Sequence, residues 1–189
     1  SPGRAAVVAA GMRYVSTRGR APERGFTDIL LSGLADDGGL YVPAYYPQVT
    51  RADLDAWRTL SYAELAAEII GRYATDIAPA RLAQLCHATY SASVYSNSRP
   101  GSAASDITPL RWLEPGLALL ELSNGPTLAF KDMAMQLLGA LFEHVLAERG
   151  GLRALPSQAV DQVVGLPPPS RDAVAIGRGE ALDHLVVEL

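Results

Sequence analysis

The chain has 189 residues, of which 49% are hydrophobic and 19% are charged, and its formal net charge is -4. Such a composition excludes a disordered chain and suits one domain, or a small domain with part of a second. The acidic balance argues against a nucleic-acid partner, and no apolar run has the length of a membrane span. We therefore expect a cytoplasmic protein, with residues 1–11 as a non-native extension ahead of Met12.

The first predicted elements are two short strands with a helix between them. Residues 13–17 (RYVST) and 40–42 have the composition of strands. Thr27 is placed to cap a helix in which apolar residues share one face. The glycine and aspartate residues at 36–39 predict a turn before the second strand.

Two further helices are predicted before an exposed loop at 91–105. Ser61 and Glu64 form a capping-box pattern, and Pro79 suits the first turn of the next helix. One face of that helix carries the residues that we expect to be buried: Leu82, Leu85, Cys86 and Thr89. Cys86 is the only cysteine, which excludes an internal disulfide and predicts a buried thiol rather than a nucleophile. The histidines lack metal-ligand spacing, so we expect no metal site: His87, His144 and His184.

A ligand site is predicted where the next strand meets the next helix. Residues 117–122 (LALLEL) are typical of a buried strand, and 131–149 of a long helix. No charge occurs between 133 and 142, so we expect this helix to be buried on most sides. The loop at 123–127 joins the two, and ligands of open α/β folds bind at such junctions.

The chain has one lysine, Lys131, among its 16 lysine and arginine residues, and it lies in an apolar setting. Lysine can lose its proton and form an imine with an aldehyde, whereas arginine cannot. A position at the start of a helix and removal from water both disfavour the ammonium form. We therefore expect Lys131 to be buried, uncharged and directed at an aldehyde. The alternative is a lysine whose stem packs on Phe130 while its amine reaches water.

Four blocks, in this order, resemble the threonine synthase family. They are YVSTRG at 14–19, LADDGGLYVP at 34–43, DITPL at 106–110 and LELSNGPTLAFKD at 120–132. The resemblance implies an α/β chain with an incomplete type II pyridoxal-phosphate enzyme fold, of the kind seen in the tryptophan synthase β subunit. It divides the chain into a threonine synthase-like N-terminal domain at 12–105 and the start of the cofactor domain at 106–150.

The resemblance also implies an activity and a set of site residues. The activity is the conversion of O-phospho-L-homoserine and water to L-threonine and phosphate, in threonine biosynthesis. Lys131 would bind pyridoxal 5'-phosphate and move protons, and Asn124 and Thr127 would line the cofactor site. The substrate phosphate would be bound by residues of the first strand and the turn after it: Ser16, Thr17 and Arg18.

Residues 151–189 depart from the family pattern. They contain no aromatic residue, and they lack the SGDTG-like loop that the family uses to bind the cofactor phosphate through backbone amides. We interpret this tail as unrelated or out-of-frame sequence, and we expect a truncated, inactive enzyme. Two other interpretations remain open. One is a type II lyase acting on serine or cysteine derivatives, which the block at 34–43 disfavours, and the other is a non-catalytic interaction module.

Overall fold

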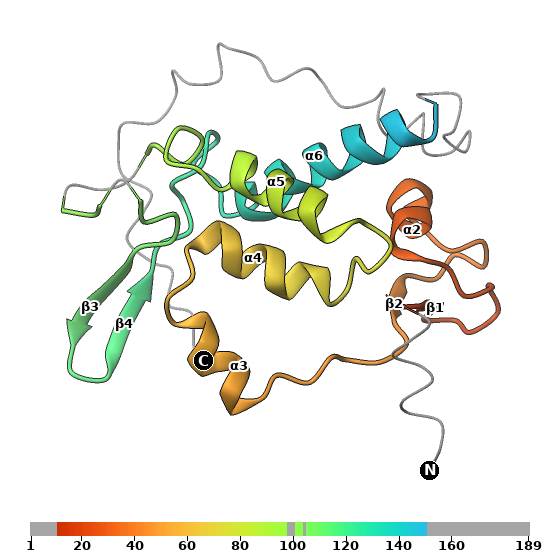
Figure 1. Cartoon of the computed structure of the whole chain (residues 1–189), viewed down its shortest axis with the longest axis horizontal. Coiled ribbons are helices and arrows are strands. Elements are labelled where there is room, and N and C mark those ends of the chain that lie inside the picture. Colours follow the sequence, from red (N-terminus) through yellow and green to blue (C-terminus); the bar gives the residue numbers. More distant parts are fainter. Residues whose placement is uncertain (1–10, 98–100, 104, 151–189) are drawn as a thin grey trace.

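A computed structural model of the chain describes residues 11–97, 101–103 and 105–150 (Figure 1). The interpretations of residues 1–10 and of the tail at 151–189 lie outside this part of the chain. Within it, no helix is long and apolar enough to cross a membrane.

The N-terminal part is a two-stranded antiparallel ribbon with a short helix between its strands in sequence. Strand β1 (Tyr14–Ser16) pairs with β2 (Tyr41–Pro43), which confirms both predicted strands. Helix α2 (Phe26–Ser32) is capped by Gly25, so the prediction of Thr27 as its cap is wrong. Thr27 lies within the first turn, where its backbone N–H and its hydroxyl both donate to Asp76, each at 2.9 Å.

Three helices follow: α3 (Arg51–Trp57), α4 (Tyr62–Gly71) and α5 (Pro79–Thr89). The structure confirms the capping box at Ser61 and the proline in the first turn of α5. Helix α3 was not predicted. Its capping box joins Thr50 to Asp53, a pattern that the sequence does contain, and two hydrogen bonds from Thr50 hold the pKa of Asp53 down at about 2.

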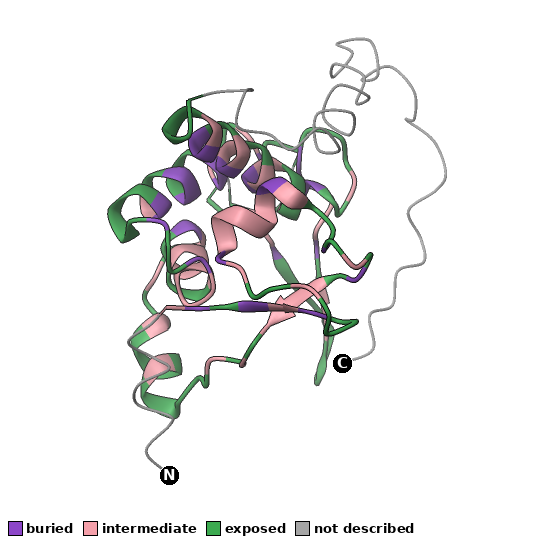
Figure 2. Cartoon of the chain, turned by 90° about the vertical axis from the view of Figure 1, so that its right-hand side faces the viewer, coloured by how far each residue is buried: buried purple, intermediate pink, exposed green. Residues whose placement is uncertain are grey.

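The core lies where α4, α5 and α6 (Asp132–Glu148) meet (Figures 1 and 2). Leu82 and Cys86 of α5 are almost fully buried, and Leu137 and Leu141 of α6 pack in the same cluster. Cys86 is buried, as predicted, and burial raises the pKa of its thiol to about 11, which disfavours the thiolate.

Strands β3 (Leu110–Glu114) and β4 (Leu117–Leu120) form an antiparallel hairpin that projects beside the helices (Figure 1). Every residue of β3 is exposed, and the ends of β4 are exposed too. The prediction of a buried strand is therefore wrong for β4, which among the described residues pairs on one edge only, with β3.

Helix α6 confirms the predicted long helix but not its burial on most sides. Its buried residues form one face, and Met135 on another face is 48% exposed. The C-terminal end of α6 packs on α2, where Leu31 and Val145 share a small core and Arg149 binds Asp28 at 2.7 Å. The absence of charge at 133–142 therefore marks an amphipathic helix with an apolar exposed side.

Candidate functional site

Lys131 stands directly before α6, at its N-cap position, with helical backbone angles. Its side chain is exposed, and its amine lies 4.7 Å from the centre of the Phe130 ring. The prediction that Lys131 is buried is therefore wrong within the described chain. The reason is that its apolar neighbours are exposed as well, Leu128 at 53% and Phe130 at 56%, so they do not remove the amine from water.

The Asp132 carboxylate closes the loop around Lys131 by accepting two hydrogen bonds from Thr127. The backbone N–H of Thr127 donates to Asp132 Oδ2 at 2.8 Å, and the Thr127 hydroxyl donates to Asp132 Oδ1 at 2.8 Å. Asp132 is 3% exposed, so this bond pair satisfies a buried charge. Gly125 faces the same carboxylate, and a Cβ at that position would lie 2.5 Å from the Asp132 Cβ atom.

Hydrogen bonds to backbone carbonyls hold the first half of the loop, and their donors are two asparagine side chains and one backbone N–H. The side chain of Asn124, which is buried, donates to the carbonyl of Ile107 at 3.2 Å. Asn97 donates twice, from its backbone to the carbonyl of Asn124 and from its side chain to the carbonyl of Gly125. Segments far apart in sequence thereby fix the loop in one place.

Two tyrosines anchor the start of α6. The Tyr95 hydroxyl donates to the carbonyl of Asp132 at 2.9 Å, and the Tyr90 hydroxyl donates to the carbonyl of Met133 at 2.8 Å. Burial raises the pKa of Tyr95 to about 12 and raises that of Tyr90 as well, so both phenols stay protonated as donors. The first amides of α6 also have partners, because those of Asp132 and Met133 donate to the carbonyls of Ala129 and Phe130.

Leu128 adopts a left-handed backbone conformation, with φ at 59°. For a residue with a branched side chain this conformation costs about 1 to 2 kcal/mol. It occurs in the short segment between Thr127 and Asp132, which their hydrogen bonds close. The loop therefore holds one strained residue next to Lys131.

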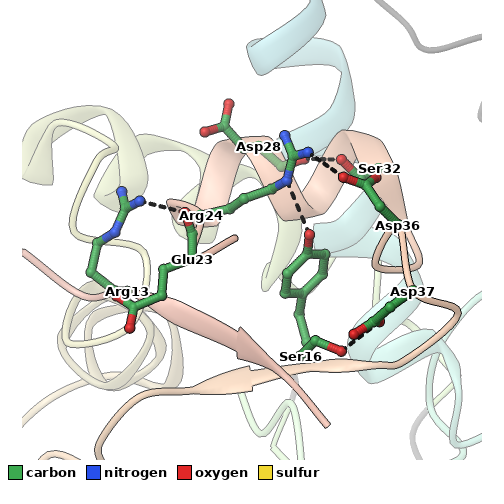
Figure 3. A network of polar contacts seen from close by, with 9 residues as sticks. Arg13, Ser16, Glu23, Arg24, Asp28, Ser32, Asp36 and Asp37 are labelled. Atoms are coloured by element: carbon green, nitrogen blue, oxygen red, sulfur yellow. Dashed lines mark hydrogen bonds and ion pairs between the residues drawn. The ribbon is translucent and has the colours of Figure 1, made fainter. Parts of the chain in front are cut away.

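The predicted substrate residues form a separate polar group at β1. The Ser16 hydroxyl donates to Asp37 Oδ1 at 2.7 Å (Figure 3). Arg18 donates to the Asp37 carbonyl at 3.2 Å. The bond from Ser16, with others from backbone amides, holds the pKa of Asp37 down at about 2. Thr17 accepts a bond from the backbone of Leu40 at 3.0 Å. Ser16 and Thr17 thus hold the turn, and the Arg18 guanidinium is exposed.

The structure does not bring this group to Lys131. Helix α2 links β1 to the C-terminal end of α6, through the Tyr14 and Phe26 rings on one side and through Asp28 and Arg149 on the other (Figure 1). Lys131 lies at the opposite end of α6, and a helix of 17 residues is about 25 Å long.

The residues around Lys131 fit an aldehyde cofactor in one respect. Lys131 offers an accessible primary amine at the positive end of a helix, on a loop held by several hydrogen bonds. The amides of Asp132 and Met133 at this helix start already donate to the carbonyls of Ala129 and Phe130, so they are not free to bind a phosphate group. In the described ranges, no group of histidine, cysteine and acidic residues could hold a metal ion.

Sequence reasoning missed the residues that organise the loop. Asp132 enters the sequence analysis only as the last residue of the block at 120–132, and Asn97 and Tyr95 are not singled out. The spacing of Thr127 and Asp132 across a Gly-Pro bend was visible in the sequence. The contacts from Asn97 and Tyr95 depend on tertiary packing, and no local pattern signals them.

Comparison with known proteins shows what the chain is similar to. Residues 13–90 match the family described as Threonine synthase N terminus. The chain is 55% identical over 139 residues to threonine synthase of Methylobacillus glycogenes and 48% identical over 141 residues to that of Pseudomonas aeruginosa. Each match covers 74% of this chain, but 29% of the first relative and 28% of the second.

A solved structure gives the same result for the fold. Pyridoxal phosphate-bound threonine synthase from Brucella melitensis superposes with a TM-score of 0.65 at 43% identity, covering 74% of this chain and 28% of that one. The described residues thus have the N-terminal portion of a mixed helix-and-strand fold found in a pyridoxal-phosphate enzyme. In sequence and in fold, about three quarters of the chain thus matches the N-terminal portion of threonine synthases.

Proposed function

We propose that this chain provides the cofactor-lysine segment of a threonine synthase that acts in the cytoplasm. The proposed reaction converts O-phospho-L-homoserine and water to L-threonine and phosphate. The observation that supports it is Lys131, the single lysine, placed accessibly at the start of α6 in a chain 55% identical to a threonine synthase. In this proposal, 12–105 is the N-terminal domain and 106–150 begins the cofactor domain.

Pyridoxal phosphate, when bound, supplies an electron sink for bonds made and broken next to the substrate amine. Lys131 holds the cofactor through its amine and carries protons between substrate carbons. Asn124 and Thr127 line the site on the loop before it. The exposed guanidinium of Arg18 binds the substrate phosphate, while Ser16 and Thr17 support its turn.

We also propose that the 189-residue chain alone turns over little substrate. Lys131 lies on an open surface of the described chain, where water reaches it, and an open site weakens the electrostatic interactions that catalysis uses.

A non-catalytic interaction module is the second candidate, because the same surface is apolar. Large exposed side chains gather between residues 110 and 135: Leu110, Trp112, Leu113, Leu117, Leu120, Leu128, Phe130 and Met135. Exposed apolar surface on this scale is typical of an interaction site.

A segment exchange tests the proposed function. Residues 13–150 of this chain replace the matching segment of the Methylobacillus glycogenes relative, with which the chain shares 55% identity over 139 residues. We expect the purified chimera to release phosphate from O-phosphohomoserine and to form threonine, measured together. A chimera that folds and binds pyridoxal phosphate but forms no threonine would contradict the proposal and favour the interaction module.

A further inference from the structure

The proposed function gives no role to Asp132, although this acidic residue is next to Lys131 and almost fully buried, at 3% exposure. Both of its carboxylate oxygens are bound by Thr127, one by the backbone N–H and one by the hydroxyl. The Lys131 amine has an aromatic ring as its contact, at 4.7 Å, and forms no ion pair with the described residues. These two adjacent residues of opposite charge thus form no ion pair with each other, because each has other contacts.

We propose that Thr127 holds the Asp132 carboxylate away from the Lys131 amine, so that the amine remains available to an aldehyde. This proposal rests on the proposed function, which makes Lys131 the aldehyde-binding group. It adds that Thr127 and Asp132 are positioning residues. Thr127 also lines the proposed cofactor site, but the role assigned here is to hold the carboxylate. Each acts through Lys131.

The fold provides a prepared place for the carboxylate. Gly125 leaves the space that the Asp132 side chain fills, since a Cβ there would lie 2.5 Å from Asp132 Oδ2. Tyr95 fixes the Asp132 backbone by donating to its carbonyl. Leu128 takes its left-handed conformation within the segment that the Thr127–Asp132 bonds close. The position of the carboxylate is therefore set by several contacts from different parts of the chain.

The charge of the Asp132 carboxylate matters because it can change the protonation of the Lys131 amine. A carboxylate within about 4 to 6 Å of an ammonium group favours the charged form, commonly by a factor of ten or more in the protonation equilibrium. Only the uncharged amine adds to a carbonyl carbon. The titratable groups packed at this end of α6 are Tyr90 and Tyr95, and both stay neutral because burial raises their pKa values.

The test uses the fact that the chain has a single lysine. Acetic anhydride is added to the purified chain at a series of pH values, and mass spectrometry measures the acetylation rate of the Lys131 peptide. Thr127→Val removes the hydroxyl bond to Oδ1 and keeps the backbone bond to Oδ2, so that one carboxylate oxygen becomes available to pair with Lys131. We expect acetylation to be roughly tenfold slower at a given pH, with the rate profile displaced to higher pH. In Asp132→Asn the profile should stay close to that of the wild type, because the carboxylate is already held away from the amine.

Two further variants separate the effect of the carboxylate position from the effect of a less stable fold. Thr127→Ser keeps the hydroxyl and should retain the wild-type profile. Thr50→Val cuts the same kind of threonine–aspartate bond at α3, where Thr50 donates to Asp53 at 2.7 and 2.8 Å, and should leave the Lys131 profile unchanged.

An undisplaced profile in Thr127→Val, or a displaced one in Asp132→Asn, would overturn the proposal. If Thr127→Val does not fold, Asp132→Asn decides: its profile matches the wild type if the carboxylate is held away, and moves to lower pH if the carboxylate already stabilises the ammonium form. Failure of the proposed function is seen separately, as a wild-type chain that reacts with acetic anhydride but forms no adduct with pyridoxal phosphate.

Discussion

Replacing Lys131 with arginine should lower threonine formation by the segment-exchange chimera at least about a hundredfold, the scale of a lost general acid–base group. Arginine keeps the positive charge and most of the length, but it does not give up its proton or bind an aldehyde carbon. Steady-state formation of threonine and phosphate is the measurement.

Two controls belong with Lys131→Arg. Because Lys131 is exposed and contacts Phe130, the thermal midpoint of the chimera should stay within a degree or two of its parent. Glu143→Gln, at an exposed position further along α6, should leave the activity unchanged. An active Lys131→Arg chimera would show that Lys131 is not the cofactor-binding residue.

Gly125→Ala should destabilise the chain by about 1 to 3 kcal/mol, the usual range for an overpacked interior. The added Cβ would lie 2.5 Å from the Asp132 side chain, which cannot move without losing its bonds to Thr127. Urea unfolding of the purified chain gives the free energy of unfolding.

Gly139→Ala is the matched control. Gly139 lies within α6, and a Cβ there meets no atom within 4 Å. Alanine in an exposed helix interior is more favourable than glycine by roughly 0.5 to 1 kcal/mol, so this variant should be more stable than wild type. Equal effects of the two substitutions would show that the loop at Gly125 tolerates a side chain and that the packing against Asp132 is loose.

The sequence predicted those elements best whose signals are local. The buried face of α5 and the cap of α4 followed from helical spacing and from the Ser61–Glu64 pattern, and the structure confirms both. Helix α3 carries an equally local signal, the Thr50–Asp53 capping box, so it could have been predicted.

Burial was harder to predict than secondary structure. Apolar runs such as 117–122 show that a segment can be buried, but whether it is buried depends on which other elements cover it. In the described chain β4 pairs only with β3, and Leu117 and Leu120 stay exposed. The same reasoning explains Lys131, whose apolar neighbours in sequence do not surround it in space.

The sequence predicted the position of Lys131 but not the contacts that hold the loop before it. The position of Lys131 at a loop-to-helix junction followed from the Gly-Pro bend and the helical pattern after it. The orientation of the Asp132 carboxylate and the left-handed Leu128 could not be predicted, since both depend on how the loop packs on Asn97 and Tyr95.

Reductive labelling tests the central claim most directly. The purified chain is mixed with pyridoxal phosphate, reduced with borohydride and digested, and the adduct is located by mass spectrometry. We predict that the label is on the peptide that contains Lys131. A chain that acquires no label, or is labelled only at its N-terminal amine, would contradict the account.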